Sequence, residues 1–257
     1  MIIKSTDLLF SDKLAPITTN MGFIQADNQS VVDEFHIWIQ EINSRLDRQL
    51  SIDDSKISGD LETVLRSLLP LQRSNSDKFV LIPTSSSWIA ICDNGYRGTD
   101  PLTIGYLAEK LNCLACWFVA RPHSMKSIGF SRLGRQGAII FELYGPKQTE
   151  WLNLIRQVRL EYTLEKWEFS EFGKPLPFEN TKEYQSKKVS DKFSFNSLSH
   201  CLRELDIFPF SDEFYLPPDS NVAHLIQVQG GEIIPGTSVS LQQARRLVGI
   251  KDRQSRS

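Results

Sequence analysis

The residues best suited to chemistry lie in one loop that follows a short apolar segment. Asp93, Tyr96, Arg97 and Asp100 stand within eight positions of one another, beside glycines that let the backbone turn tightly. Asp100 is a good N-cap and is followed by a proline, so the loop feeds the N-terminus of a helix. Such a terminus attracts anions, and an arginine adds a bidentate partner. The spacing therefore predicts a binding site for an anionic ligand or a partner protein.

The same loop also has a purely structural interpretation. Gly95 and Gly98 then shape the backbone, Asp100 caps the helix, and Arg97 pairs with Asp93. Both interpretations stay open on the sequence alone. A P-loop is excluded, because the glycines are not followed by Lys-Ser or Lys-Thr at the required spacing.

Two further candidates follow a predicted strand over residues 115–121. Arg121 ends this strand, and His123 comes two positions later. A histidine beside a carboxylate such as Asp93 or Glu142 would form a general acid–base pair. The structural alternative is a loop histidine that is bonded to the backbone. Arg121 and His123 join the loop residues as candidates for a partner or ligand surface.

Motifs that define an enzyme are missing from the chain. It contains no Gly-x-Ser-x-Gly elbow, no His-Glu-x-x-His pair and no EF-hand loop. We therefore assign no catalytic residue, expect no cofactor or metal, and favour a binding protein while leaving an enzyme open. Cys113 and Cys116 form a lone Cys-x-x-Cys without a second half, so Cys116 is expected to begin a buried strand.

The start of the chain lacks the apolar segment of a secretory signal, and no run approaches the ~20 apolar residues of a membrane span. We therefore expect a cytoplasmic protein with reduced thiols and no membrane contact. The net charge of −2 gives no reason to expect nucleic acid as a partner. Basic residues gather between positions 97 and 135, and acidic residues gather within the first 62. This asymmetry marks either a partner surface or two parts of the chain that pack together.

The hydrophobic pattern predicts an α+β fold with a mostly antiparallel sheet of about seven strands, flanking helices and an N-terminal helix pair. Residues 1–75 are expected to form a helical segment that packs on the main domain. Residues 76–250 form the α+β domain, and residues 251–257 form a disordered tail. The composition, 40% hydrophobic and 23% charged, excludes a wholly disordered chain and a small disulfide scaffold.

Three segments carry a resemblance to other proteins. They hold Trp88, Ala90, Asp93, Asn94, Gly95, Arg97, Gly98, Thr99 and Asp100; then Gly173, Pro175, Leu176, Pro177, Phe178, Glu179 and Tyr184; and finally Ser240, Leu241, Ala244, Arg245 and Arg246. Over residues 78–250 the chain resembles uncharacterised bacterial proteins and is similar to the immunity proteins of bacterial polymorphic-toxin systems. This resemblance implies a cytoplasmic, single-domain α+β protein that neutralises one toxin by stoichiometric binding. It assigns no functional residue.

The resemblance and the missing motifs together predict a protein that binds one protein partner. The alternative is a small enzyme or ligand-binding protein that uses the loop at 93–100 for an anionic ligand. The sequence does not set the oligomeric state.

Overall fold

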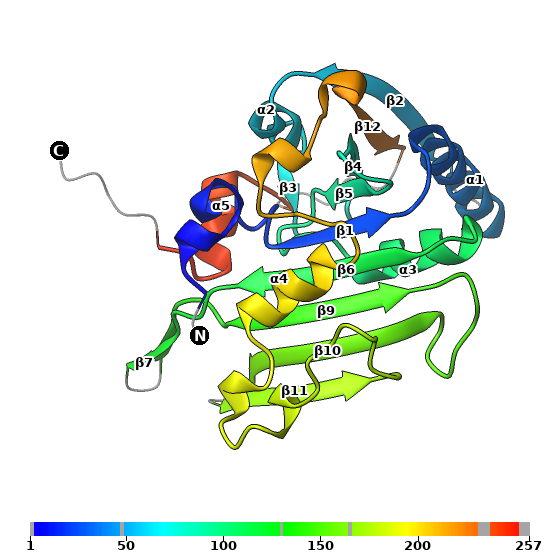
Figure 1. The fold of residues 1–257 in the computed structure, drawn as a ribbon. Helices are drawn as coiled ribbons and strands as arrows, with labels where there is room; N and C mark the ends of the chain where they lie inside the picture. Colours follow the sequence, from blue (N-terminus) through cyan, green and yellow to red (C-terminus); the bar gives the residue numbers. More distant parts are fainter. Residues whose placement is uncertain (1–2, 47–48, 129–130, 164–165, 231–236, 252–257) are drawn as a thin grey trace.

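A nine-stranded antiparallel sheet forms the centre of the molecule (Figure 1). The computed structural model describes residues 3–46, 49–128, 131–163, 166–230 and 237–251. In spatial order the strands are β11 (Lys166–Phe172), β10 (Leu154–Thr163), β9 (Ala138–Tyr144), β6 (Ala115–Arg121), β1 (Asn20–Ile24), β5 (Ile89–Asp93), β4 (Lys78–Pro83), β12 (Val222–Gln229) and β2 (Ser51–Ser58).

Short elements complete the described chain. Strands β3 (Leu71–Gln72) and β13 (Ser238–Val239) pair with each other, as do β7 (Lys126–Ile128) and β8 (Ser131–Leu133). The 3₁₀ helices are η1 (Ser5–Asp7), η2 (Leu9–Asp12), η3 (Glu183–Gln185), η4 (Val189–Asp191), η5 (Asp212–Phe214) and η6 (Pro218–Ser220).

Apolar side chains cover both faces of the sheet, because successive residues of a strand point to opposite sides. One face is packed by α1 (Asn28–Leu46) and α3 (Pro101–Lys110), and we call it the α1/α3 face. The other face is packed by α2 (Leu61–Arg66), α4 (Phe195–Arg203) and α5 (Leu241–Leu247), and we call it the α4 face. Trp117 belongs to the first layer and its neighbour Phe118 to the second.

Helix ends follow the local signals of the sequence. Asp60, Asp100 and Ser240 accept backbone N–H groups as the N-caps of α2, α3 and α5, and Gln243 completes a capping box with Ser240. The predicted strand that begins near Cys116 is confirmed as β6, with Cys116 buried. Strands β4 and β5 pair with each other in antiparallel orientation.

The prediction of an α+β fold is confirmed, but the expected number of strands is too low. The sheet has nine strands rather than about seven, because β1 and β2 come from the first 60 residues. The two N-terminal helices exist, yet β2 lies between them in the chain and β1 precedes both. Residues 1–75 are therefore part of the sheet and not only a helical segment packed on it. Within the predicted tail, residues 252–257 lie outside the described residues.

The reason for this difference is visible in β1. Its residues Met21, Phe23 and Ile24 are fully buried between β5 and β6, and they pack against both layers. A strand that is buried on both faces lacks the polar alternation that marks a half-exposed strand. The described helices include none that is long and apolar enough to cross a membrane.

Candidate functional site

Asp93 ends β5 and lies beneath the loop that leads to α3. Its carboxylate accepts hydrogen bonds from the backbone N–H groups of Gly95 at 2.7 Å and Asp100 at 3.1 Å. Burial raises the pKa of this carboxyl to about 6, although these hydrogen bonds act in the opposite direction. Only 1% of the residue is exposed. Asp93 therefore shapes the loop from inside and does not face solvent.

Two carboxylates of the chain itself occupy the N-terminus of α3. Asp100 accepts the backbone N–H of Leu102 at 2.9 Å, and Asp93 accepts the N–H of Asp100. A bound anion would meet both of these charges, and like charges repel. The geometry of this helix end thus fits the structural interpretation of Asp93 and Asp100 better than an anion site.

The rest of the loop is held against neighbouring strands. Gly98 has a φ of +92°, and a Cβ at this position would lie 3.0 Å from the carbonyl oxygen of Pro16. The carbonyl oxygen of Thr99 accepts a hydrogen bond from the indole Nε1 of Trp117 at 2.9 Å. Close packing and a left-handed backbone together require glycine at this point.

Tyr96 and Arg97 form the outer surface of the loop. Arg97 is exposed, its Nε donates to the Tyr96 hydroxyl at 2.7 Å, and its guanidinium lies 5.2 Å from the centre of the Tyr96 ring. The carbonyl oxygen of Arg97 accepts from Nδ2 of Asn20 at 3.0 Å. Arg97 does not pair with Asp93, because Asp93 is bonded to backbone groups in the interior while Arg97 extends outward.

Arg121 lies near Arg97 on the α1/α3 face. The Nη2 atom of Arg121 is 3.8 Å from the carboxylate of Glu161, and Arg159 donates to the same carboxylate at 2.7 Å. Burial lowers the pKa of Arg121, and the charges of Arg135, Arg97 and Arg159 lower it further, whereas Glu161 acts in the opposite direction. The structure thus brings together two of the sequence candidates, Arg97 and Arg121.

His123 lies on the other side of the sheet. Its ring stacks on Tyr162, with ring centres 4.1 Å apart, and also contacts Trp167. Tyr162 follows Glu161 on β10, so the two side chains point to opposite faces. The Nδ1 atom of His123 accepts the backbone N–H of Gly137 at 3.2 Å, and burial lowers the pKa of the ring. The structure therefore separates His123 from Arg121.

The α1/α3 face over β10 and β11 is polar and partly open to solvent. Gln157, Arg159 and Glu161 alternate along β10 with buried residues of the α4 face. Glu142 of β9 lies buried next to them, where it accepts hydrogen bonds from the Tyr144 hydroxyl at 2.5 Å and from Nε2 of Gln157 at 2.7 Å. Burial raises the pKa of Glu142.

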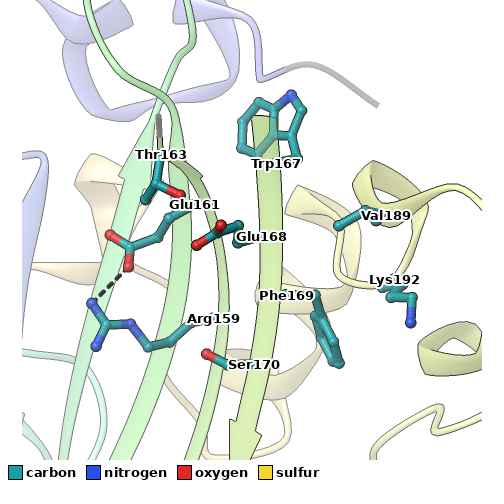
Figure 2. Close-up of a pocket in the computed structure, with 9 residues that line it drawn as sticks. All are labelled: Arg159, Glu161, Thr163, Trp167, Glu168, Phe169, Ser170, Val189 and Lys192. Atoms are coloured by element: carbon teal, nitrogen blue, oxygen red, sulfur yellow. Dashed lines mark hydrogen bonds and ion pairs between the residues drawn. The ribbon is translucent and has the colours of Figure 1, made fainter. Parts of the chain in front are cut away.

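An open depression of about 500 Å³ surrounds the edge strand β11. Figure 2 shows Arg159, Glu161, Glu168 and Ser170 on one side of this strand and Trp167, Phe169, Val189 and Lys192 on the other. The lining residues come from both faces of the sheet and do not converge on a common point. This depression is therefore the flank of a sheet edge and not an enclosed pocket for a small substrate.

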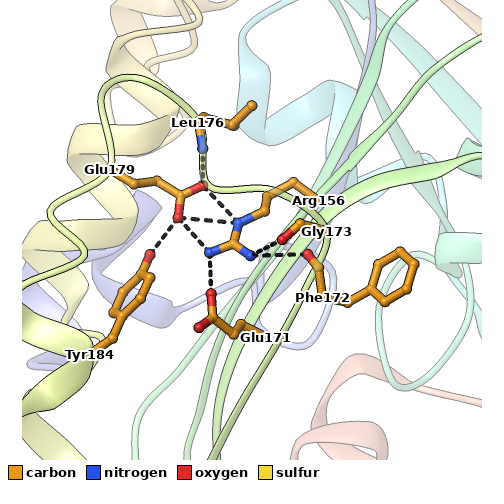
Figure 3. A network of polar contacts seen from close by, with 7 residues as sticks. All are labelled: Arg156, Glu171, Phe172, Gly173, Leu176, Glu179 and Tyr184. Atoms are coloured by element: carbon orange, nitrogen blue, oxygen red, sulfur yellow. Dashed lines mark hydrogen bonds and ion pairs between the residues drawn. The ribbon is translucent and has the colours of Figure 1, made fainter.

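A buried network around Arg156 holds the segment that follows β11 (Figure 3). The side chains of Arg156 and Glu179 are both 0% exposed, and Nη2 of Arg156 lies 2.6 Å from the Glu179 carboxylate. Glu171 binds the same guanidinium at 2.6 Å, and the Tyr184 hydroxyl donates to Glu179 at 2.7 Å. Burial acts to lower the pKa of Arg156, but the hydrogen bonds with these two glutamates raise it overall.

Backbone groups complete this network. Arg156 donates to the carbonyl oxygens of Phe172 and Gly173, and the Leu176 N–H donates to Glu179. Gly173 has a φ of +80°, and a Cβ there would collide with the carbonyl oxygen of Ile155. The segment 173–179, which stands out in the sequence, is therefore fixed by a residue on β10 that the sequence did not single out. The network around Arg156 therefore has a structural role.

The cysteines offer no redox or metal site among the described residues. All four are free thiols, and Cys92, Cys116 and Cys201 are buried. Burial raises the pKa of the Cys113 thiol to about 11 and holds that of Cys116 well above its usual value. No group of three or more His, Cys, Asp or Glu side chains in the described ranges is arranged to hold a metal ion.

Fold and site together describe an α+β protein whose candidate residues are divided: Asp93 is buried in the loop, Tyr96, Arg97 and Asp100 form its outer part, and Arg121 and His123 lie on opposite faces of the sheet. No family model matches the chain, and neither the curated proteins nor the solved structures include a significant match.

Proposed function

We propose that this chain is a cytoplasmic binding protein of the bacterial immunity type, which neutralises one toxin by forming a stoichiometric complex. The observation that carries the proposal is the partly open α1/α3 face over β10, beside the loop that presents Tyr96 and Arg97. Arg121 and Arg159 are 31% and 37% exposed on this face, so they are ordered yet accessible.

Residue types on this surface are those enriched at protein interfaces. Arginine and tyrosine contribute more binding energy than most residues, since they combine apolar contact area with hydrogen-bond donors. The guanidinium of Arg97 is held beside Tyr96, which reduces the side-chain entropy lost on binding. A polar surface whose arginines are already held by neighbouring side chains suits a folded protein partner.

An enzyme that uses Asp93 and His123 has less support. Asp93 is almost completely buried, and His123 packs on the α4 face of β10 while Arg121 lies on the opposite face. Residues that share a catalytic step need to reach one reacting group. The other candidate function, binding of an anionic ligand by the loop at 93–100, is supported by Arg97 but not by the helix end, which two carboxylates already occupy.

Charge reversal at Arg97 tests the proposal. We expect tagged Arg97→Glu to capture its partner from the native host at least tenfold less well than the unchanged protein, because one charged interface contact typically changes affinity by this factor. Quantitative mass spectrometry of the captured proteins gives the measurement. Arg66→Glu is the matched control, since Arg66 is an exposed arginine on α2, next to the α4 face.

Circular dichroism establishes whether each variant is folded. The proposal is contradicted if folded Arg97→Glu retains the full amount of a partner that binds one-to-one. It is also contradicted if the unchanged protein captures nothing in a fixed molar ratio.

A further inference from the structure

The strand register places two arginines, Arg121 and Arg159, on either side of Glu161 on the α1/α3 face. Arg121 lies opposite Ala138, which lies opposite Glu161, so Arg121 and Glu161 stand two strands apart, roughly 10 Å between backbones. Arg159 precedes Glu161 by two positions and therefore points to the same side. Arg97 lies in the loop beside this pair, close enough for its charge to lower the pKa of Arg121.

The arginines at this point outnumber the carboxylates that pair with them. Arg121 and Arg159 share the single carboxylate of Glu161, at 3.8 and 2.7 Å. Arg97 has no carboxylate partner among the described residues, and its side chain contacts the hydroxyl and the ring of Tyr96. Glu142 lies nearby, but its oxygens already accept two hydrogen bonds.

Unpaired polar atoms gather in the same region. Within the described part of the chain, six buried side-chain atoms have no hydrogen-bond partner. Four of them are the Nε atoms of Arg121, Arg135 and Arg159 and the side-chain oxygen of Asn20, and the other two are oxygens of Asn28 and Thr163. Such atoms are uncommon in folded proteins and cost stability. Polar groups that lower the stability of the fold and lie near one another are typical of a binding site.

We infer that Arg97, Arg121 and Arg159 form a site for an oxyanion, either a carboxylate or a phosphate group. The inference rests on the proposed function, because we expect the anion to be an acidic side chain of the protein partner. Guanidinium groups recognise carboxylates and phosphates through paired N–H donors, so both anions fit the same three side chains. Glu161 partly fills the site in the free protein and competes with the incoming anion.

Titration with inorganic phosphate tests the site itself. The probe is the set of arginine Nε–Hε signals in ¹⁵N-correlated NMR spectra, recorded in 0.15 M salt so that distant charges are screened. We expect saturable shifts of Arg121 and Arg159 in the unchanged protein and at least tenfold weaker binding in Arg121→Gln. Arg121→Lys, which keeps the charge but loses the fork, should fall between them.

Two further variants separate a specific site from a general effect of charge. Arg66→Gln, a change on α2, should leave phosphate binding unaltered. Glu161→Gln removes the competing carboxylate and should strengthen binding several-fold. The site is disproved if shifts fail to saturate, if Arg66→Gln weakens binding as much as Arg121→Gln, or if Glu161→Gln weakens it.

Competition identifies the source of the anion. Phosphate at saturating concentration should release the captured partner from the unchanged protein if an acidic side chain fills the site. If phosphate binds to the arginines but leaves the complex intact, a free anion is the ligand, and the assignment to the partner is overturned while protein binding stands. If phosphate binds and no partner is captured, the proposed function fails and the oxyanion site survives.

Discussion

Replacing Arg156 with methionine should lower the free energy of unfolding by about 3–5 kcal/mol. The reason is that Glu179 would remain fully buried without its counter-charge, and the carbonyl oxygens of Phe172 and Gly173 would lose a donor. Urea unfolding followed by circular dichroism measures this change. The segment that Arg156 fixes should also become more sensitive to proteolysis.

Two companion variants test the cause of that loss. Glu171→Gln alters a partner that is 40% exposed, so it should cost about 1 kcal/mol or less. The double variant Arg156→Met with Glu179→Met removes both buried charges and should recover part of the stability. Equal losses for Arg156→Met and Glu171→Gln, or no recovery in the double variant, would contradict a buried ion pair as the source.

The second large effect concerns Asp93 and pH. Its carboxyl has a pKa of about 6 in the folded protein and 3.8 as the reference value, so the folded state binds the proton more tightly. Between these two values the unfolded chain has lost a proton that the folded protein keeps. The contribution of Asp93 to stability therefore falls as the pH rises from about 4 to 6, by about 3 kcal/mol in total.

Asp93→Asn isolates this contribution, because asparagine does not titrate. The difference in unfolding free energy between Asp93→Asn and the unchanged protein should shift in favour of the variant by about 2.4 kcal/mol between pH 4 and pH 7, because a part of the total effect lies below pH 4. We also expect Asp93→Asn to lower the unfolding free energy by an amount that does not depend on pH. The reason is that asparagine offers one acceptor oxygen to the two N–H groups of Gly95 and Asp100.

Asp60→Asn serves as the control with opposite sign. The hydrogen bonds from Thr63 lower the pKa of the Asp60 carboxyl. The unfolding free energy of the unchanged protein should therefore rise relative to that of Asp60→Asn as the pH rises. Urea unfolding at five pH values between 3 and 7 measures both variants, because the effect of Asp60 lies mainly below pH 5 and the effect of Asp93 mainly above pH 4. A pH-independent difference for Asp93→Asn would show that the folded protein does not hold this proton more tightly.

Local signals in the sequence predicted much of the fold. The caps at Asp60, Asp100 and Ser240 depend on side chain and backbone within three residues of one another, so the sequence alone contains them. The strand β1 was missed because its neighbours β5 and β6 come much later in the chain. Its five residues, Asn20–Ile24, have no local pattern that distinguishes a buried strand from an apolar turn.

The candidate site shows the same division between local and distant information. The cap formed by Asp100 was predictable, whereas the approach of Arg97 to Arg121 depends on how β1 and β6 pair. The sequence did not indicate that Arg156 is buried, because a charged residue on a half-buried strand normally faces solvent. A shift in the pairing of β9 and β10 between Leu154 and Arg156 accompanies its burial on the α4 face. Strand register, which pairs distant residues, was not available from one sequence.

The central place of β1 has a consequence for the order in which the chain folds. Strands β5 and β6 flank β1, and β12 joins β2 to β4 only near the end of the chain. Bringing such distant segments together costs loop-closure entropy before any apolar area is buried. During synthesis, β1 leaves the ribosome before its partners exist, so its apolar side chains lack their native neighbours until β5 and β6 have emerged.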